Sequence, residues 1–178
     1  MKKDSKSFNL PEKCPQCVVR ILDRPEWFEI PGIVASARVA EVKGFSRLLS
    51  SKKLAKEEIG AIALGSTIYF RRPELYNPHT VAGIAFLAHE LKHVEQYKRD
   101  GLLMFIARYV WDFIVHRGYS EKLRYEAEAS EFQRQVAAHL SREFSNNSGS
   151  HPCKEKGEPH SVNEHYLVEK PAAFQYRV

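Results

Sequence analysis

The sequence predicts an α+β protein in which a small β-sheet built around a hairpin packs on a layer of helices. A Gly-Ser pair separates two short apolar segments, and an Asn-Pro pair precedes a long amphipathic segment followed by two more with helical periodicity. With 178 residues, of which 43% are apolar and 28% charged, the chain can bury one core and has a globular composition. We therefore expect one folded domain with flanking segments.

Three segments make up the predicted organisation. Residues 1–36 are polar and interrupted by prolines, so they are predicted to form an irregular or short-helical N-terminal lead-in. Residues 37–144 carry the hairpin and helix patterns and form the predicted domain. Residues 145–178 begin with Asn-Asn-Ser-Gly-Ser and are predicted to form a loosely ordered C-terminal tail.

The hairpin is predicted over residues 61–70. Residues 61–64 and 67–70 are mostly apolar, and Gly65-Ser66 between them suits a type II′ turn, whose first central residue has a positive φ. The second strand, residues 67–70, is where we expect an extended peptide to add as a further strand.

Three helices are predicted after the hairpin. Asn77 suits an N-cap and Pro78 suits the first helical position, which predicts a helix from this pair to about Arg99. A second helix is predicted over residues 102–116 and a third over residues 119–144, with a glycine between them.

Residues 102–115 form the longest apolar run. The run is shorter than the roughly 20 residues that span a bilayer, so no transmembrane span is predicted. Arg108 and Asp112 lie four residues apart and can pair on one face of a helix. We predict a buried, covered helix, with an interfacial helix on a membrane surface as the alternative.

Composition limits the function classes. The net charge is +5, but the basic residues are distributed among 22 acidic ones, so nucleic-acid binding does not follow. The polar residues 1–6 are not followed by the apolar stretch of a signal peptide. We expect a protein that is cytoplasmic as synthesised, with export independent of a signal peptide as the alternative.

Cys14 and Cys17 have the spacing of half a zinc site, which His151 and Cys153 would complete. A redox pair is a second interpretation. Free thiols are the favoured interpretation, because three cysteines do not indicate a disulfide scaffold and a reducing compartment is expected.

The first predicted helix contains His89-Glu90-Leu91-Lys92-His93, which has the HExxH spacing. Residues four apart lie on one face of a helix, so the two imidazoles converge on a metal ion. Glu90 lies one step round the helix, within reach of a water molecule at that ion. This geometry is typical of metal-assisted hydrolysis.

The helical phase supports a site on this helix. An apolar stripe faces the core and consists of Ile84, Leu87, Leu91 and Val94. The two histidines lie on nearly the opposite side, in phase with Phe86 and Tyr97. Surface histidines on a solvated face are the alternative, but such a face does not usually carry two aromatic residues.

A catalytic zinc needs a third protein ligand, and the third predicted helix offers Glu126 and Glu128. On a helix these two point about 160° apart, so they cannot both face one metal. Glu126 shares its flank with Ala137 and Phe144, whereas Glu128 shares its flank with polar residues. We predict Glu126 as the ligand, and Glu128 stays open as the alternative.

A resemblance to a known family covers residues 37–97. Residues 37–39, 63–70, 76–83 and 87–96 resemble the core-domain family associated with extracellular contractile injection systems and, more distantly, gluzincin-type zinc metallopeptidases. In the Glu126 region, Ala129 matches the general gluzincin third-ligand helix, and Ser130 replaces its Asp. The resemblance implies a zincin-like fold, a peptidase-like activity and a protein partner in an injection apparatus.

We therefore predict a zinc-dependent metallopeptidase that acts on a peptide or protein. His89, His93 and Glu126 are expected to hold Zn²⁺, with Glu90 as the general base. Three side chains are candidates for stabilising an oxyanion: Tyr119, Tyr125 and His139. The alternative is a noncatalytic module that keeps the zincin fold and serves the assembly of an injection or toxin apparatus.

Overall fold

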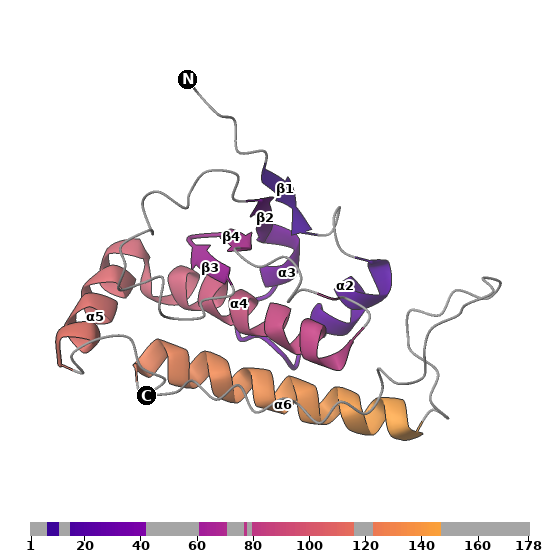
Figure 1. Cartoon of the computed structure of the whole chain (residues 1–178). Coiled ribbons are helices and arrows are strands. Elements are labelled where there is room, and N and C mark those ends of the chain that lie inside the picture. Colours follow the sequence, from indigo (N-terminus) through magenta and orange to yellow (C-terminus); the bar gives the residue numbers. More distant parts are fainter. Residues whose placement is uncertain are drawn as a thin grey trace.

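The structure is a computed structural model that describes residues 7–10, 15–41, 61–70, 77, 80–115 and 123–146. These residues form a four-stranded sheet with helices, which confirms the predicted α+β class (Figure 1). The predicted tail beyond residue 146 lies outside the described residues, and so do residues 116–122, where the third helix is predicted to begin.

The sheet contains, in spatial order, β1 (Ser7–Asn9), β2 (Arg38–Glu41), β4 (Thr67–Phe70) and β3 (Ala61–Leu64). β1 and β3 run antiparallel to their neighbours, whereas β2 and β4 are parallel to each other. Leu64 pairs with Thr67, so the loop between β3 and β4 has only two residues, and Gly65 has a φ of 60°. Primed turns need this positive φ at their first central residue, and the predicted hairpin is confirmed.

β4 is not a free edge of the sheet. It pairs with β2 on one side and with β3 on the other, so that Ile68 has Val39 and Ala63 as its partners. The prediction that a peptide adds to residues 67–70 is therefore wrong, because both rows of backbone hydrogen-bonding groups are already used. The edges of the sheet, within the described residues, are β1 and β3.

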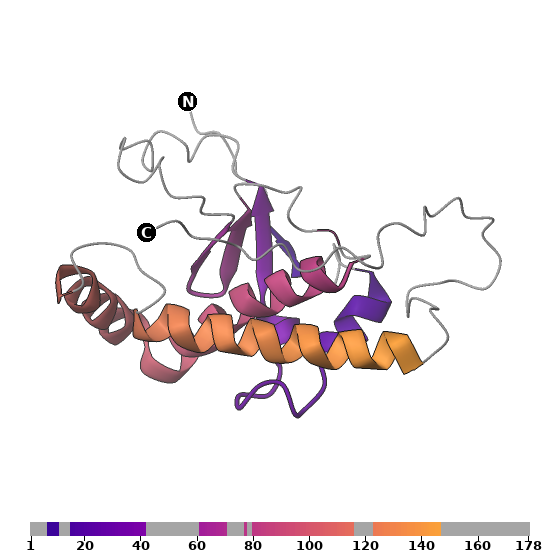
Figure 2. The same cartoon turned by 60° about the horizontal axis from the view of Figure 1, so that its bottom comes forward.

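The described residues form five helices: α2 (Gln16–Leu22), α3 (Ile33–Ser36), α4 (Val81–Asp100), α5 (Leu102–Val115) and α6 (Arg124–Asn146). α4 lies between the sheet and α6 in both views of the ribbon (Figures 1 and 2). α5 follows the end of α4 and extends to one end of this helical layer (Figure 2). The helix with the HExxH spacing is thus central, in contact with the sheet on one side and with α6 on the other.

The core forms where α4 meets the sheet and α6. The predicted stripe of α4 is fully buried, and α6 also buries its apolar stripe of Tyr125, Ala129, Phe132, Val136 and Leu140. Residues of the lead-in belong to the same buried cluster, among them Leu10, Val18, Leu22 and Ile33. Full burial of one such aliphatic side chain stabilises the fold by about 1.5–3 kcal/mol.

α4 begins later than predicted. Its N-cap is Thr80, whose side-chain oxygen accepts a hydrogen bond from the Gly83 N–H at 3.0 Å. The Asn77 carbonyl oxygen instead accepts a hydrogen bond from the Thr80 N–H at 3.1 Å. The prediction of Asn77 as the N-cap is wrong, since Thr80 caps the helix by binding the Gly83 N–H, one of the free N–H groups of the first turn.

Gly83 is required by the close approach of the Asn77 backbone. A Cβ atom on Gly83 would lie 2.0 Å from the Asn77 carbonyl oxygen. We expect Gly83→Ala to lower the free energy of unfolding by about 1–3 kcal/mol because of this overlap. Urea denaturation followed by circular dichroism measures the effect.

The control for this prediction is Ala82→Gly at the adjacent, exposed position of α4. There the ordinary helix preference applies, and the glycine variant should be less stable by about 1 kcal/mol. Glycine is thus expected to be the better residue at position 83 and the worse one at position 82. A Gly83→Ala protein that is more stable than the wild type would contradict the close approach.

α5 is exposed, so the prediction of a covered helix is wrong. Leu103 and Trp111 are 84% and 67% exposed, and six more large apolar side chains of the helix are exposed as well. Phe105 is buried and stacks on Tyr97 and Tyr125. Among the described residues, no helix is long and apolar enough to cross a membrane.

The predicted pairing of Arg108 with Asp112 on α5 is also wrong. Arg108 donates to the Asp100 carboxylate at 3.0 Å, and Asp112 accepts from the Arg124 N–H at 3.3 Å. Both side chains therefore bind neighbouring elements, because the charged side of α5 faces the junction between α4 and α6.

Candidate metal centre

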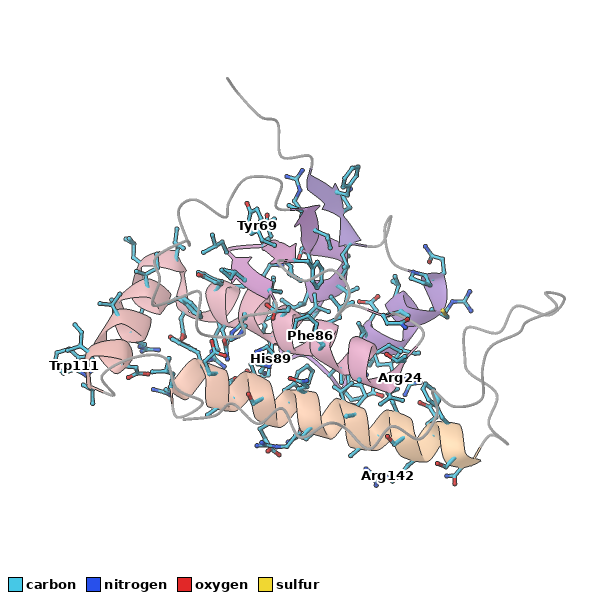
Figure 3. All side chains as sticks on the ribbon, in the orientation of Figure 1. Arg24, Tyr69, Phe86, His89, Trp111 and Arg142 are labelled. Carbon is cyan, nitrogen blue, oxygen red and sulfur yellow. The ribbon has the colours of Figure 1, made fainter. Side chains whose placement is uncertain are left out.

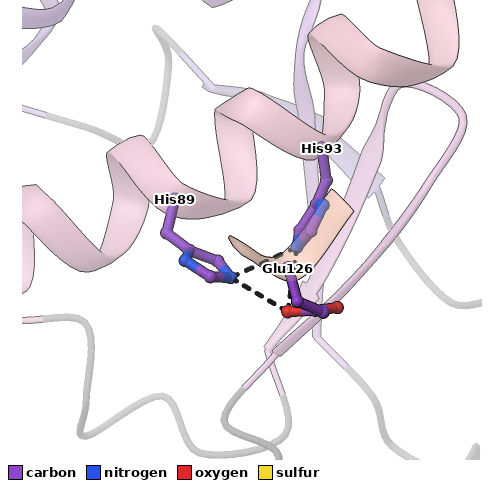
Figure 4. Close-up of side chains that lie close together, drawn as sticks. All are labelled: His89, His93 and Glu126. Atoms are coloured by element: carbon purple, nitrogen blue, oxygen red, sulfur yellow. Dashed lines mark hydrogen bonds and ion pairs between the residues drawn. The ribbon is translucent and has the colours of Figure 1, made fainter. Parts of the chain in front are cut away.

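α4 and α6 bring three ligand-type side chains together. His89 and His93 lie one turn apart on α4, and Glu126 lies opposite them in the first turn of α6 (Figure 4). His89 Nε2 lies 3.2 Å from His93 Nε2, and Glu126 Oε2 lies 3.6 Å from each of these nitrogens. The ligand atoms all lie within 4.8 Å of one another, so the group could bind a metal ion.

The group is largely shielded from water. The side chains of His89, His93 and Glu126 are 12%, 9% and 10% exposed. Burial lowers the pKa of His93, but the neighbouring Glu126 carboxylate outweighs burial and raises this pKa to about 9. Burial in turn raises the pKa of Glu126, yet attraction by His93 and His89 brings it well below its ordinary value. The negative charge of Glu126 that favours a proton on His93 also favours a metal cation between these side chains.

Two buried atoms at the site have no hydrogen-bond partner among the described residues, namely His89 Nδ1 and Glu90 Oε2. Burial raises the pKa of the Glu90 carboxyl, while His89 and His93 act in the opposite direction. An unpaired buried polar atom is costly and is typical of groups that meet a ligand, an ion or a reacting molecule. In Figure 3, the labelled His89 lies between α4 and α6.

Gln96 fixes the orientation of His93. It is fully buried, and its Oε1 lies 2.8 Å from His93 Nδ1. Its amide nitrogen donates to the Tyr125 carbonyl oxygen and to the Glu128 carboxylate, both at 3.1 Å. When Nδ1 donates to Gln96, Nε2 carries the lone pair that a metal needs. Gln96 thereby ties His93 on α4 to the backbone beside Glu126 on α6.

Glu128 has a different set of partners. Its carboxylate accepts hydrogen bonds from Arg99 at 2.9 and 3.1 Å and lies 3.4 Å from the Lys92 ammonium group. Burial acts to raise the pKa of Glu128, but the Arg99 guanidinium outweighs burial and lowers it to about 2. The structure therefore places Glu126, and not Glu128, beside the histidines.

The comparisons with known proteins concern the segment that carries the histidines. A family model described as the eCIS core domain matches residues 49–101. This segment of the chain is therefore similar to the eCIS core domain. No curated protein and no solved structure matches the chain. The matched residues, which we call the eCIS core segment, include His89, Glu90 and His93 but end before Glu126.

Within the eCIS core segment, sequence reasoning did not identify the roles of Gln96 and of a buried ion pair. Lys92 lies 2.7 Å from Glu95, and Glu95 also accepts a hydrogen bond from the Ile30 N–H at 2.9 Å. The sequence did contain spacings that indicate both contacts, because residues three apart on a helix are neighbours. Gln96 follows His93 by three residues, and Glu95 follows Lys92 by three. Their partners Tyr125 and Ile30, however, lie far away in the sequence.

The oxyanion candidates do not join the metal group. The Tyr125 hydroxyl donates to Asp100, and His139 Nε2 lies 3.1 Å from the Arg24 guanidinium. The His139 ring also packs edge-on against Trp27. Tyr119 lies outside the described residues.

The state of one cysteine, Cys17, differs from the predicted one. Cys17 is disulfide-bonded, so the prediction of a free thiol is wrong there, and an oxidised Cys17 cannot serve as a zinc thiolate. Cys14, His151 and Cys153 lie outside the described residues.

Proposed function

We propose that the protein is a zinc-dependent peptidase with a zincin-like fold of the gluzincin type. The observation that carries the proposal is the triangle of His89 Nε2, His93 Nε2 and Glu126 Oε2, with sides of 3.2, 3.6 and 3.6 Å. Ligand atoms about 2.0–2.1 Å from a tetrahedral zinc lie about 3.3–3.4 Å apart. The triangle thus has the size of one face of such a tetrahedron and leaves the fourth corner open.

The donor set supports zinc as the metal. Two imidazole nitrogens and one carboxylate oxygen form the ligand set of several zinc peptidases, and the order of a HExxH helix followed by a Glu on a later helix is the gluzincin one. When bound, Zn²⁺ would supply Lewis acidity, which lowers the pKa of a water molecule to about 7 and polarises a peptide carbonyl.

Glu90 is the residue that would move the proton. Its Oε2 has no hydrogen-bond partner among the described residues, so a lone pair can accept a proton from the attacking water. Burial raises the pKa of the Glu90 carboxyl, which makes the carboxylate a stronger base than an exposed one. The same oxygen can then pass the proton to the leaving amine, as general acid–base catalysis requires.

A noncatalytic assembly module is the second candidate function. The eCIS core match favours it, because that family is associated with an injection apparatus and therefore with protein partners. In this case the three-ligand group would bind a metal for stability, and no peptide would be cleaved. Both candidates require the metal centre, and they differ in whether Glu90 takes part in a reaction.

Metal analysis combined with a cleavage assay tests the proposal. Full-length protein purified without added metal is expected to contain stoichiometric zinc and to cleave members of a peptide library. A chelator should abolish cleavage, and Zn²⁺ should restore it, whereas Mg²⁺ should not because it prefers octahedral oxygen ligands. Zinc binding without cleavage would favour the assembly module, and the absence of zinc binding would overturn the metal centre.

A further inference from the structure

The outer side of α5 is an apolar surface without a described partner. Its exposed fractions range from 45% to 84% over the residues Leu102, Leu103, Met104, Ile106, Val110, Trp111, Ile114 and Val115, which we call the α5 apolar surface. At 3.6 residues per turn, these positions cover an arc of about 220° around the helix axis. Figure 3 shows the labelled Trp111 on α5, away from the other labelled residues.

The opposite side of α5 attaches the helix to the rest of the protein. Phe105 is buried in a stack with Tyr97 and Tyr125, with ring centroids 3.8 and 4.4 Å away. The two charged residues of the helix, Arg108 and Asp112, bind α4 and α6 on this same side. The α5 apolar surface is therefore held in place and carries no charged residue.

We propose that α5 binds the surface of an anionic phospholipid bilayer and lies in its interface. A groove on a protein covers one face of a helix, whereas an apolar arc of about 220° suits a medium that surrounds most of the helix, as acyl chains do. The 14 residues of α5 are about 21 Å long and do not cross a hydrocarbon core of about 30 Å. Trp111 is of the type that prefers the membrane–water interface.

The charges beside α5 favour anionic headgroups. The Arg108 side chain is 44% exposed, whereas its partner Asp100 is only 13% exposed. Arg124 is also exposed, and its backbone N–H donates to Asp112. Arg108 and Arg124 are thus exposed beside the charged side of α5, while Asp100 is mostly buried. A negatively charged lipid surface complements this arrangement.

Vesicle flotation of the full-length protein tests the inference, which is independent of the metal centre. The protein is expected to float with phosphatidylcholine vesicles that contain phosphatidylglycerol, and less with phosphatidylcholine alone. Leu103→Glu should lower the bound fraction at least tenfold, because it places a charge in the acyl-chain region. The matched control is Leu64→Glu, the same change at an exposed apolar residue of β3, which should leave flotation unchanged. Equal flotation of Leu103→Glu and the wild type, or no flotation at all, would overturn the inference.

Tryptophan fluorescence gives a second readout that does not depend on a charge change. The chain has two tryptophans, so the difference between wild type and Trp111→Phe reports Trp111 alone. Its emission should shift to the blue and become protected from acrylamide when the anionic vesicles are added. Protection without vesicles in a monomeric protein would mean that another segment of the chain covers α5. Protection that depends on dimer formation would mean that a second copy covers it, and either outcome would overturn the lipid assignment.

Discussion

Glu90→Gln is expected to retain the metal and to lower the rate of peptide hydrolysis by about 100- to 10,000-fold. The amide has nearly the same shape as the carboxylate, so the ligand geometry of His89, His93 and Glu126 should persist. It cannot accept the proton of the attacking water, however, and the buried Oε2 of Glu90 is the atom that would do so. Zinc content and the rate of cleavage of a peptide found in the library assay are the two measurements.

The control for Glu90→Gln is Glu131→Gln, the same chemical change on the exposed surface of α6, where Glu131 binds Arg134 and Gln135. It should alter neither zinc content nor cleavage. Equal activity of Glu90→Gln and the wild type would exclude Glu90 as the base. Loss of zinc from Glu90→Gln would instead mean that this carboxylate contributes to metal binding.

Zinc affinity is expected to fall in a graded series, with Glu126→Ala weakest, Gln96→Leu intermediate and Glu128→Ala close to the wild type. Glu126 supplies a ligand atom to the triangle. Removing it should therefore lower zinc affinity by more than the roughly 10- to 100-fold that is lost with a partner that only orients a ligand. Gln96 is such a partner of His93 and should fall within that range. Glu128 binds Arg99 and Lys92, and its contact with Gln96 is only one of several that hold this amide.

Competition with a zinc-sensitive dye measures this series, and circular dichroism of the metal-free proteins shows whether each variant folds. Glu126→Gln serves as a second variant, since it keeps the side-chain volume and removes only the charged ligand. A larger loss of affinity for Glu128→Ala than for Glu126→Ala would overturn the assignment of the third ligand. A wild-type affinity for Gln96→Leu would show that packing alone orients His93.

Local patterns in the sequence determined the hairpin, the buried face of α4 and the pairing of the two histidines. The hairpin of residues 61–70 follows from Gly65 at a position with positive φ, and the buried stripe of α4 follows from apolar residues at helical spacing. The convergence of His89 and His93 is equally local, because residues four apart on a helix always share a face. Each of these features depends on backbone geometry within one element or one turn.

Tertiary contacts decided the rest. Glu126 and Glu128 flank the stripe of α6 at similar angles, so the sequence favoured Glu126 only through the apolar residues on its flank. The packing of α6 on α4 turns Glu126 toward the histidines and Glu128 toward Arg99. The exposure of α5 was likewise not predictable, since an apolar periodicity shows that a helix face avoids water but not which element covers it. Both outcomes depend on the relative rotation of helices distant in the sequence, which side-chain packing sets and which no local spacing encodes.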